Sequence, residues 1–149
     1  MHILKILERK GPLALIVLSL LIMGCAGTPL GPAFTELGQV PEGKGLIYIY
    51  RPSLPYEFGV TFEVKANDVP VVGIRDGSYY PYVSSLGRVV LSSKRTGEET
   101  GSLVLTIRSG EVYYVKLIPV RGVFRFKPVL TLENKATAEG EIAPTRLIQ

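Results

Sequence analysis

Hydrophobic and polar residues alternate with a period of two along much of the chain after residue 45. Between 58 and 65, for example, Phe and Val at even positions alternate with Gly, Thr, Glu and Lys at odd ones. This alternation is typical of a strand with one buried face. The pattern predicts about eight strands, at 46–51, 58–66, 69–74, 78–84, 88–94, 102–109, 112–119 and 124–133.

Turn-forming pairs separate several of these segments. Asn67-Asp68, Asp76-Gly77 and Ser109-Gly110 each interrupt a hydrophobic run with residues that favour tight turns. Many short strands joined by such turns predict an all-β fold, an antiparallel β-sandwich of immunoglobulin-like or transthyretin-like type, over residues 45–133. Without Trp or a Cys pair, a disulfide-pinned immunoglobulin domain is excluded.

The remaining sixteen residues, 134–149, are expected to form a C-terminal tail. Only Asn134 to Glu141 has a helical composition in the chain after the leader, and Gly140 and Pro144 keep that segment short.

The first 24 residues have the three parts of a secretory signal peptide. Basic residues precede an apolar run from Leu13 to Met23, which ends at the small residue Gly24. As a helix these eleven apolar residues would span about 16 Å, against roughly 30 Å of bilayer hydrocarbon. Residues 1–24 are therefore expected to be cleaved rather than to span the membrane.

The sequence Leu21-Ile22-Met23-Gly24-Cys25 resembles the lipobox of bacterial lipoproteins. The resemblance implies cleavage between Gly24 and Cys25, a diacylglycerol thioether on Cys25, and a fatty acyl group such as palmitate on the new amino terminus. Ala26 stands where inner-membrane lipoproteins carry Asp, which favours the periplasmic face of the outer membrane. In the alternative, Cys25 is an incidental thiol in an ordinary signal peptide or in the amino-terminal anchor of an inner-membrane protein.

Residues 25–44 are rich in glycine and proline, a composition that predicts a flexible tether between the lipidated Cys25 and the sandwich.

Composition and charge exclude several classes of function. The 149 residues carry a formal charge of +4, and removing residues 1–24 takes away three bases and one acid, which leaves about +2. No Lys/Arg cluster remains that would neutralise phosphates in series, so no nucleic acid is expected as a partner. The single His lies in the leader and the single Cys is the lipidation site. We therefore predict no catalytic residue, no metal site and no cofactor beyond the lipid on Cys25.

Three ordered landmarks resemble a family of small bacterial envelope lipoproteins with a β-rich domain of unknown function. They are Tyr-Arg-Pro-Ser at 50–53, Gly-Ser-Tyr at 77–79, and Gly-x-x-Tyr-Tyr-Val at 110–115. The likeness covers roughly 44–133 and departs at 84–88, where the family usually has a Pro-Gly-Lys-His-like turn. It implies an envelope β-domain and supplies no catalytic residue.

The eight tyrosines are the remaining functional signal. Tyr79, Tyr80 and Tyr82 lie on one predicted strand, where adjacent side chains face opposite sides, so at least one ring should point outward. Together with Arg51 they form a candidate binding surface, because Tyr and Arg favour interfaces. In the alternative, the tyrosines are half-buried strand residues and Arg51 pairs with a nearby acid while Pro52 ends its strand.

The sequence thus predicts a membrane-anchored lipoprotein that acts as a non-enzymatic interaction or structural module of the cell envelope, with an envelope protein or glycan as partner. A second hypothesis is a periplasmic module that binds a small ligand or glycan on a Tyr-rich face. A third is a hydrolase in which Glu57, Glu63 and Glu111 converge as paired carboxylates.

Overall fold

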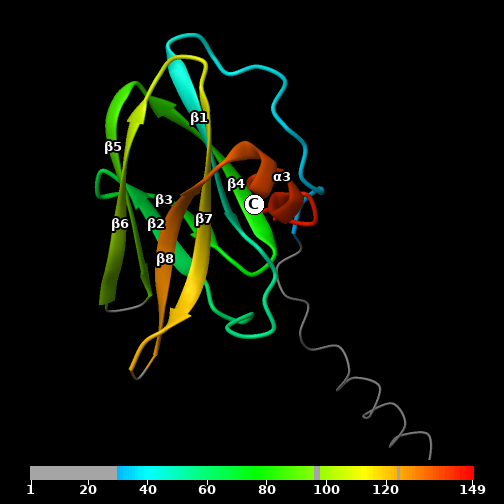
Figure 1. The fold of residues 1–149 in the computed structure, drawn as a ribbon, viewed down its shortest axis with the longest axis vertical. Coiled ribbons are helices and arrows are strands. Elements are labelled where there is room, and N and C mark those ends of the chain that lie inside the picture. Colours follow the sequence, from blue (N-terminus) through cyan, green and yellow to red (C-terminus); the bar gives the residue numbers. More distant parts are fainter. Residues whose placement is uncertain (1–29, 96–97, 124) are drawn as a thin grey trace, which may run out of the picture.

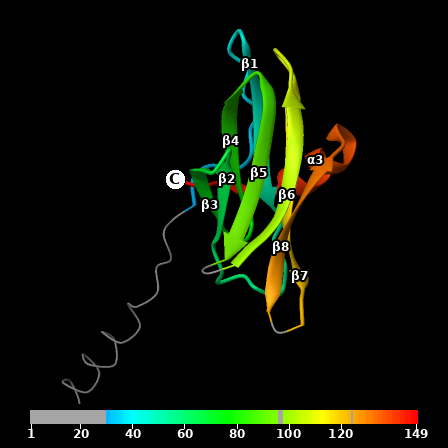
Figure 2. The same cartoon turned by 90° about the vertical axis from the view of Figure 1, so that its left-hand side faces the viewer.

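A computed structural model describes residues 30–95, 98–123 and 125–149, and these form two sheets packed face to face (Figures 1 and 2). The five-stranded sheet has the order β8-β7-β1-β4-β9 and the four-stranded sheet the order β3-β2-β5-β6. The strands of the first are β1 (Lys44–Arg51), β4 (Ser78–Ser85), β7 (Val112–Arg121), β8 (Phe126–Glu133) and β9 (Arg146–Leu147). Those of the second are β2 (Phe62–Ala66), β3 (Val69–Ile74), β5 (Gly87–Arg95) and β6 (Glu98–Ile107).

The predicted all-β sandwich is confirmed, but the five-stranded sheet is mixed rather than purely antiparallel. Strand β1 lies at its centre, antiparallel to β4 and parallel to β7, and the short β9 is parallel to β4. Alternation along a sequence predicts which residues share a face and carries no information about strand direction.

The predicted turns have the expected backbone. Asn67 and Asp68 both have positive φ angles, 48° and 65°, as a two-residue hairpin between β2 and β3 requires. The strand predicted at 58–66 begins only at Phe62. Glu57 has a φ of 58°, so the chain changes direction there, and residues 52–61 form a loop at the lower end of the molecule in Figure 1. Phe124 lies outside the described residues, and β8 begins after it, at Phe126.

The main hydrophobic core lies between the two sheets. Ile47 and Ile49 of β1 face Phe62 and Val64 of β2, and all four side chains are fully buried. Burial of aliphatic and aromatic surface on this scale is the main stabilising term of the fold.

Residues 134–149 do not form a tail, and that expectation is wrong. Asn134 caps helix α3 (Lys135–Ile142) by accepting a hydrogen bond from Thr137 N, and α3 packs on the outer face of the five-stranded sheet. After the helix, Ile148 N donates to Tyr79 O beside β9. The helix is too short for a readable periodic pattern; two buried side chains, Ala138 and Ile142, attach it to the sheet.

The described part of the expected tether, residues 30–43, also packs against the sandwich. Gly31 N donates to Leu147 O at 2.7 Å, Phe34 N donates to Thr145 O at 3.0 Å, and Ala33 forms an isolated bridge with Arg146. Glycine and proline here shape an irregular segment that is bound along its length rather than a free linker. Together with α3 it covers the outer face of the five-stranded sheet (Figure 1).

Within the described residues, every helix falls short of the length and apolar character needed to cross a bilayer.

Candidate functional site

Four tyrosines gather on the outer face of the five-stranded sheet. Tyr48 and Tyr50 of β1, Tyr79 of β4 and Tyr114 of β7 point away from the main core because their strand partners Ile47, Ile49 and Val115 point into it. We call these four residues the outer tyrosine cluster. All four are buried, since α3 and the segment 30–43 lie over them.

The rings of the outer tyrosine cluster contact one another and Phe34. Tyr48 and Tyr114 stack with centroids 5.5 Å apart and planes at 25°. Phe34 contacts Tyr48 and Tyr79 edge-on, each at 5.1 Å. Such geometry adds about 0.5–1.5 kcal/mol per pair beyond area burial, so Phe34 fixes the amino-terminal segment to the sheet.

Three hydroxyl groups of the cluster have hydrogen-bond partners on the covering segments. Tyr48 Oη accepts from Leu37 N at 2.6 Å, and Tyr114 Oη donates to Glu36 at 2.8 Å. Tyr50 Oη donates to Glu141 of α3 at 2.7 Å. Burial, together with these carboxylates, raises the pKa of both Tyr50 and Tyr114 well above the ordinary value. Tyr50 and Tyr114 therefore act as donors to these two carboxylates, while the hydroxyl of Tyr48 accepts from the backbone.

Lys116 on β7 joins the cluster to the end of β8. Its Nζ lies 2.9 Å from Glu133 and 3.1 Å from Glu141. Burial opposes the charge on Lys116, but the hydrogen bonds to the two carboxylates outweigh it, so its pKa is raised. The contact with Lys116 lowers the pKa of Glu133. These opposite shifts identify a structural ion-pair network between α3 and the sheet.

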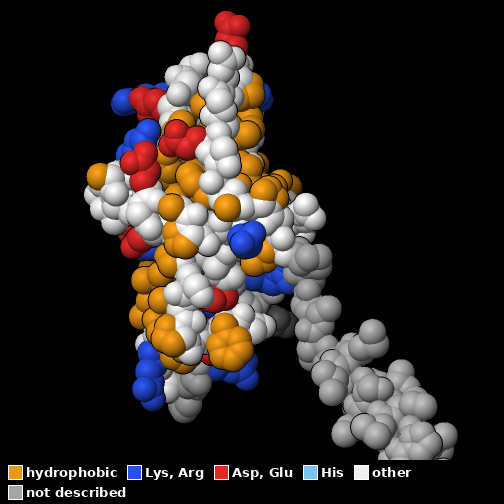
Figure 3. Space-filling model, turned by 90° about the vertical axis from the view of Figure 1, so that its right-hand side faces the viewer, with side chains coloured by type: hydrophobic (Ala, Val, Ile, Leu, Met, Phe, Trp, Pro, Cys, Tyr) orange, Lys and Arg blue, Asp and Glu red, His pale blue; other side chains and the backbone are white. Residues whose placement is uncertain are grey.

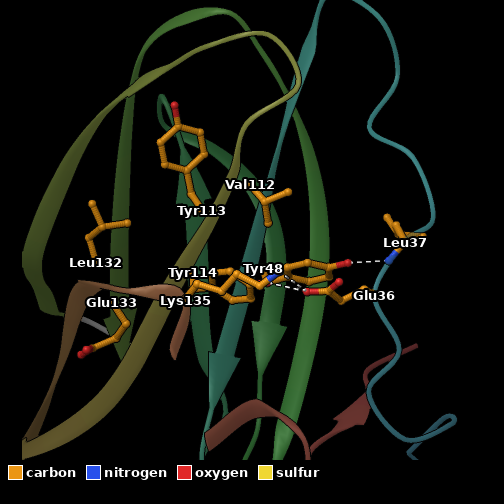
Figure 4. Close-up of a pocket in the computed structure, with 9 residues that line it drawn as sticks. All are labelled: Glu36, Leu37, Tyr48, Val112, Tyr113, Tyr114, Leu132, Glu133 and Lys135. Atoms are coloured by element: carbon orange, nitrogen blue, oxygen red, sulfur yellow. Dashed lines mark hydrogen bonds and ion pairs between the residues drawn. The ribbon is translucent and has the colours of Figure 1, made fainter. Parts of the chain in front are cut away.

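A groove opens beside the stacked pair Tyr48 and Tyr114, with a volume of about 280 Å³ (Figure 4). It lies beside the first residues of β7, which have no partner on β8 because β8 ends at Glu133, opposite Tyr114. The amino-terminal segment and the start of α3 lie on either side of it. Three half-exposed aliphatic side chains and three charged ones line it beside the tyrosines: Leu37, Val112, Leu132, Glu36, Glu133 and Lys135. Lys135 Nζ lies 3.5 Å from Glu36 at the rim. Apolar walls with a few polar groups are typical of a small-molecule site, and the volume lies slightly below the usual range for such sites.

The structure does not assemble the predicted surface of Tyr79, Tyr80, Tyr82 and Arg51. Tyr79 is 4% exposed in the outer cluster, while Tyr80 and Tyr82 pack, partly buried, against the main core. As expected, one ring of this strand, Tyr79, points to the outer face of the sheet, but it is buried there and offers no open surface. The sequence pattern could not show this, since the outer cover comes from residues 30–43 and 134–149.

Arg51 is 0% exposed and holds a loop from inside the fold rather than lying on the surface. Its guanidinium donates to Val60 O at 2.7 Å and to Glu57 O at 2.6 Å, so it holds both ends of the 57–60 turn. Asp76 lies 3.6 Å away, and the ring of Phe62 lies beneath the guanidinium at 5.1 Å. Burial lowers the pKa of Arg51 and the two acids oppose that shift. The alternative expectation, that Arg51 pairs with a nearby acid, is confirmed.

The three glutamates considered for a hydrolase do not converge. Glu57 is in the loop at the lower end, bound to Arg95 at 3.0 Å, whereas Glu111 is in the turn after β6, beside Arg108 and Tyr113. Glu63 lies on β2, opposite Lys94. Among the described residues, no group of three or more His, Cys, Asp or Glu side chains could hold a metal ion.

Gly24 and Cys25, the predicted cleavage and lipidation residues, lie outside the described residues. Of the groove residues, Glu36 and Leu37 were not identified from the sequence because they fall in the segment expected to be a tether. No family model matches the chain, and no curated protein matches it.

Proposed function

We propose that the chain is a lipid-anchored protein of the bacterial cell envelope whose β-sandwich acts as a non-enzymatic interaction or structural module. The observation that carries this proposal is the Gly24-Cys25 pair at the end of an apolar run, only five residues before the described fold begins at Leu30. Two or more acyl chains on one residue give stable membrane attachment, at about 0.8 kcal/mol per buried CH₂. Ala26 after the lipidated residue favours the periplasmic face of the outer membrane.

The assignment as an interaction module is supported by what the charged groups around the outer tyrosine cluster and the loop 52–61 bind. Arg51 is bound to a loop, Glu141 to Tyr50 and Lys116, and Glu36 to Tyr114. Each of these groups joins two segments of the fold. A protein or glycan of the envelope is the partner class we expect.

Substitution of Cys25 tests the anchor. Cys25→Ser, expressed in a Gram-negative bacterium, should abolish labelling by a palmitate analogue and leave the unprocessed precursor, because both acylation and cleavage need the sulfur. Ala26→Gly, next to the lipidation site, is the matched control and should mature and label normally. Normal maturation of Cys25→Ser would refute the proposal.

The groove supports a second candidate function, binding of a small ligand or a glycan unit against the stacked tyrosines. Val112→Arg at its wall should block such binding without affecting the core, since Val112 is 41% exposed. Val104→Arg, on the other sheet and 50% exposed, is the matched control. A glycan array and a fragment screen by NMR should give hits that Val112→Arg removes and Val104→Arg keeps. Hits equally affected by both variants, or absent altogether, would eliminate this candidate.

A further inference from the structure

The two most exposed large hydrophobic side chains described lie at one end of the molecule. Val123, at the tip of the β7–β8 hairpin, is 89% exposed, and Phe58, in the loop 52–61, is 72% exposed. In Figure 1 both segments form the lower end of the sandwich. Single exposed hydrophobics are common on soluble proteins, but two on converging loops with shared surroundings call for a reason.

This end is held in place by specific contacts. The ring of Tyr56 stacks on Phe126 of β8 with centroids 5.3 Å apart, which joins the loop to the hairpin. Arg51 fixes the same loop from inside through two backbone carbonyls, and Glu57 binds Arg95 at 3.0 Å. The apolar side chains are therefore presented by a constrained surface.

Positive charge surrounds the apolar tips. Arg121, Arg125 and Lys127 are all exposed on the hairpin, and the sequence contains no acid between Lys116 and Glu133. The sequence of the neighbouring β5–β6 hairpin, by contrast, contains two acids, Glu98 and Glu99, beside its bases Lys94 and Arg95. Figure 3 shows basic and hydrophobic side chains side by side at the lower end, with most acidic ones on this face higher up.

Exposed aromatic and aliphatic side chains flanked by Arg and Lys match the chemistry of a bilayer interface with anionic headgroups. The apolar groups enter the headgroup boundary while the bases remain beside the phosphates. We infer that this end, formed by Tyr56, Phe58, Arg121, Val123, Arg125 and Lys127, docks on the surface of an anionic lipid bilayer. We call these six residues the docking end.

The inference rests on the proposed lipid anchor, and the strand register shows that the two attachments are compatible. Gly31 lies at the same level along the five-stranded sheet as Lys116 of β7. Gly31 binds Leu147, and the strand register places Leu147, Tyr79, Tyr50 and Lys116 side by side across β9, β4, β1 and β7. From that level the hairpin extends five more residues to Arg121, about 17 Å along the strand. Leu30 also lies five residues after Cys25 along the chain, and five fully extended residues can span up to about 18 Å. Acyl chains on Cys25 can therefore reach the bilayer that the docking end contacts.

Environment-sensitive probes at the two ends of the lipidated chain test the orientation. Val123→Cys places a fluorophore at the docking end, and Leu86→Cys places one at the opposite end, in the turn between β4 and β5, where the native side chain is 48% exposed. Both chains are reconstituted, with Cys25 acylated, in vesicles of phosphatidylethanolamine and phosphatidylglycerol. The Val123 probe should shift to shorter wavelength and be quenched by lipid-borne quenchers, and the Leu86 probe should do neither. An aqueous Val123 probe, or equal responses at both sites, would overturn the inference.

Charge variants of the unlipidated mature chain, carrying Cys25→Ser, test the anionic headgroups separately. Combining Arg121→Gln, Arg125→Gln and Lys127→Gln should weaken binding to the same vesicles about 100-fold. The matched triple at the other end, Lys44→Gln, Arg88→Gln and Arg108→Gln, should change it less than about two-fold. Equal losses, or binding insensitive to phosphatidylglycerol, would contradict the inference.

The two failures can be told apart. If mass spectrometry finds no acyl group on Cys25, the proposed anchor fails. Vesicle binding by the Cys25→Ser chain then still tests, independently of the anchor, whether the docking end binds anionic lipid. If Cys25 is acylated and the Val123 probe becomes protected only after an envelope protein is added, the anchor stands and the docking end binds a protein instead.

Discussion

Arg51 shows how a single residue can belong to the core and organise a surface loop at once. Its aliphatic stem follows Ile47 and Ile49 along the inner side of β1, and its guanidinium ends among backbone carbonyls of the loop 52–61. Its Nε has no hydrogen-bond partner among the described residues, so the side chain is held by its terminal nitrogens. A buried cation that satisfies loop carbonyls costs more to remove than its ion pair alone suggests, because the acceptors lose their donors as well.

We therefore expect Arg51→Met to lower the free energy of unfolding by about 3 kcal/mol. Val60 O and Glu57 O lose their donors, and amide exchange in residues 52–61 should accelerate before global unfolding. Arg51→Lys keeps the charge but not the paired donors of the guanidinium. Its free energy of unfolding should lie between those of Arg51→Met and the wild type. Urea titration with hydrogen exchange measures both effects; unchanged stability in Arg51→Met would refute this role.

The hydroxyl of Tyr50 predicts a dependence of stability on alkaline pH. Burial and the hydrogen bond to Glu141 raise the pKa of Tyr50 in the folded state above its ordinary value of 10.0. The folded chain thus binds this proton more tightly than the unfolded chain does. The resulting stabilisation is complete below pH 10 and is lost as the pH rises from there toward the folded-state pKa.

Tyr50→Phe has no such proton, so its urea midpoint should fall less steeply than that of the wild type between about pH 9.5 and 11. The two midpoints at pH 7 provide the baseline for the comparison. Equal slopes above pH 10 would show that the hydroxyl of Tyr50 does not contribute to this linkage.

At the scale of elements, the alternation of the sequence predicts where most strands lie, but not the segments whose structure depends on tertiary contacts. Strand β5 lies close to its predicted range because it has one buried face. Residues 58–61 continue the alternation of β2 yet form a loop, since Arg51 binds the turn that precedes the strand. Helix α3 and the segment 30–43 bury few side chains and are ordered mainly by contacts with tyrosines far away in the sequence. The candidate site was missed for the same reason: part of its wall comes from these two covers.

Helix α3 is attached to the sheet chiefly through Ile142, which is fully buried, and Ala138. Ile142→Ala should lower the free energy of unfolding by about 3 kcal/mol, because it leaves a cavity over the outer tyrosine cluster. Val123→Ala removes comparable aliphatic surface from an exposed position and should change stability by less than about 0.5 kcal/mol. Thermal and urea denaturation compare the two, and similar losses would show that α3 contributes little to the fold.

At the scale of the whole molecule, the sandwich and its two covers form one folded unit. The amino-terminal segment binds the carboxyl-terminal strand, and both lie on the sheet that contains β1. Removing either cover would expose the outer tyrosine cluster and leave Tyr50 or Tyr114 without its carboxylate partner.

A chain that ends at Glu133 should therefore lose its cooperative unfolding transition, although it retains every strand predicted from the sequence. The near-ultraviolet circular dichroism of the tyrosines should flatten at the same time. A chain that lacks residues 1–24 is the control, since it retains all described contacts, and it should unfold in a single transition. If the shortened chain kept the midpoint of this control, the carboxyl-terminal residues would be dispensable.

The bond between Gly31 and Leu147 joins positions that are 116 residues apart, and it has a consequence for the order of folding. Contacts this distant along the chain form slowly, because a long loop must close before they stabilise anything. Strand β1, the first to be synthesised, pairs with β7, and the tyrosines it carries are covered only when Glu141 and Ile142 arrive. The outer face of β1 therefore stays uncovered until the segment with Glu141 and Ile142 has joined the sheet, so its burial is among the last steps of folding.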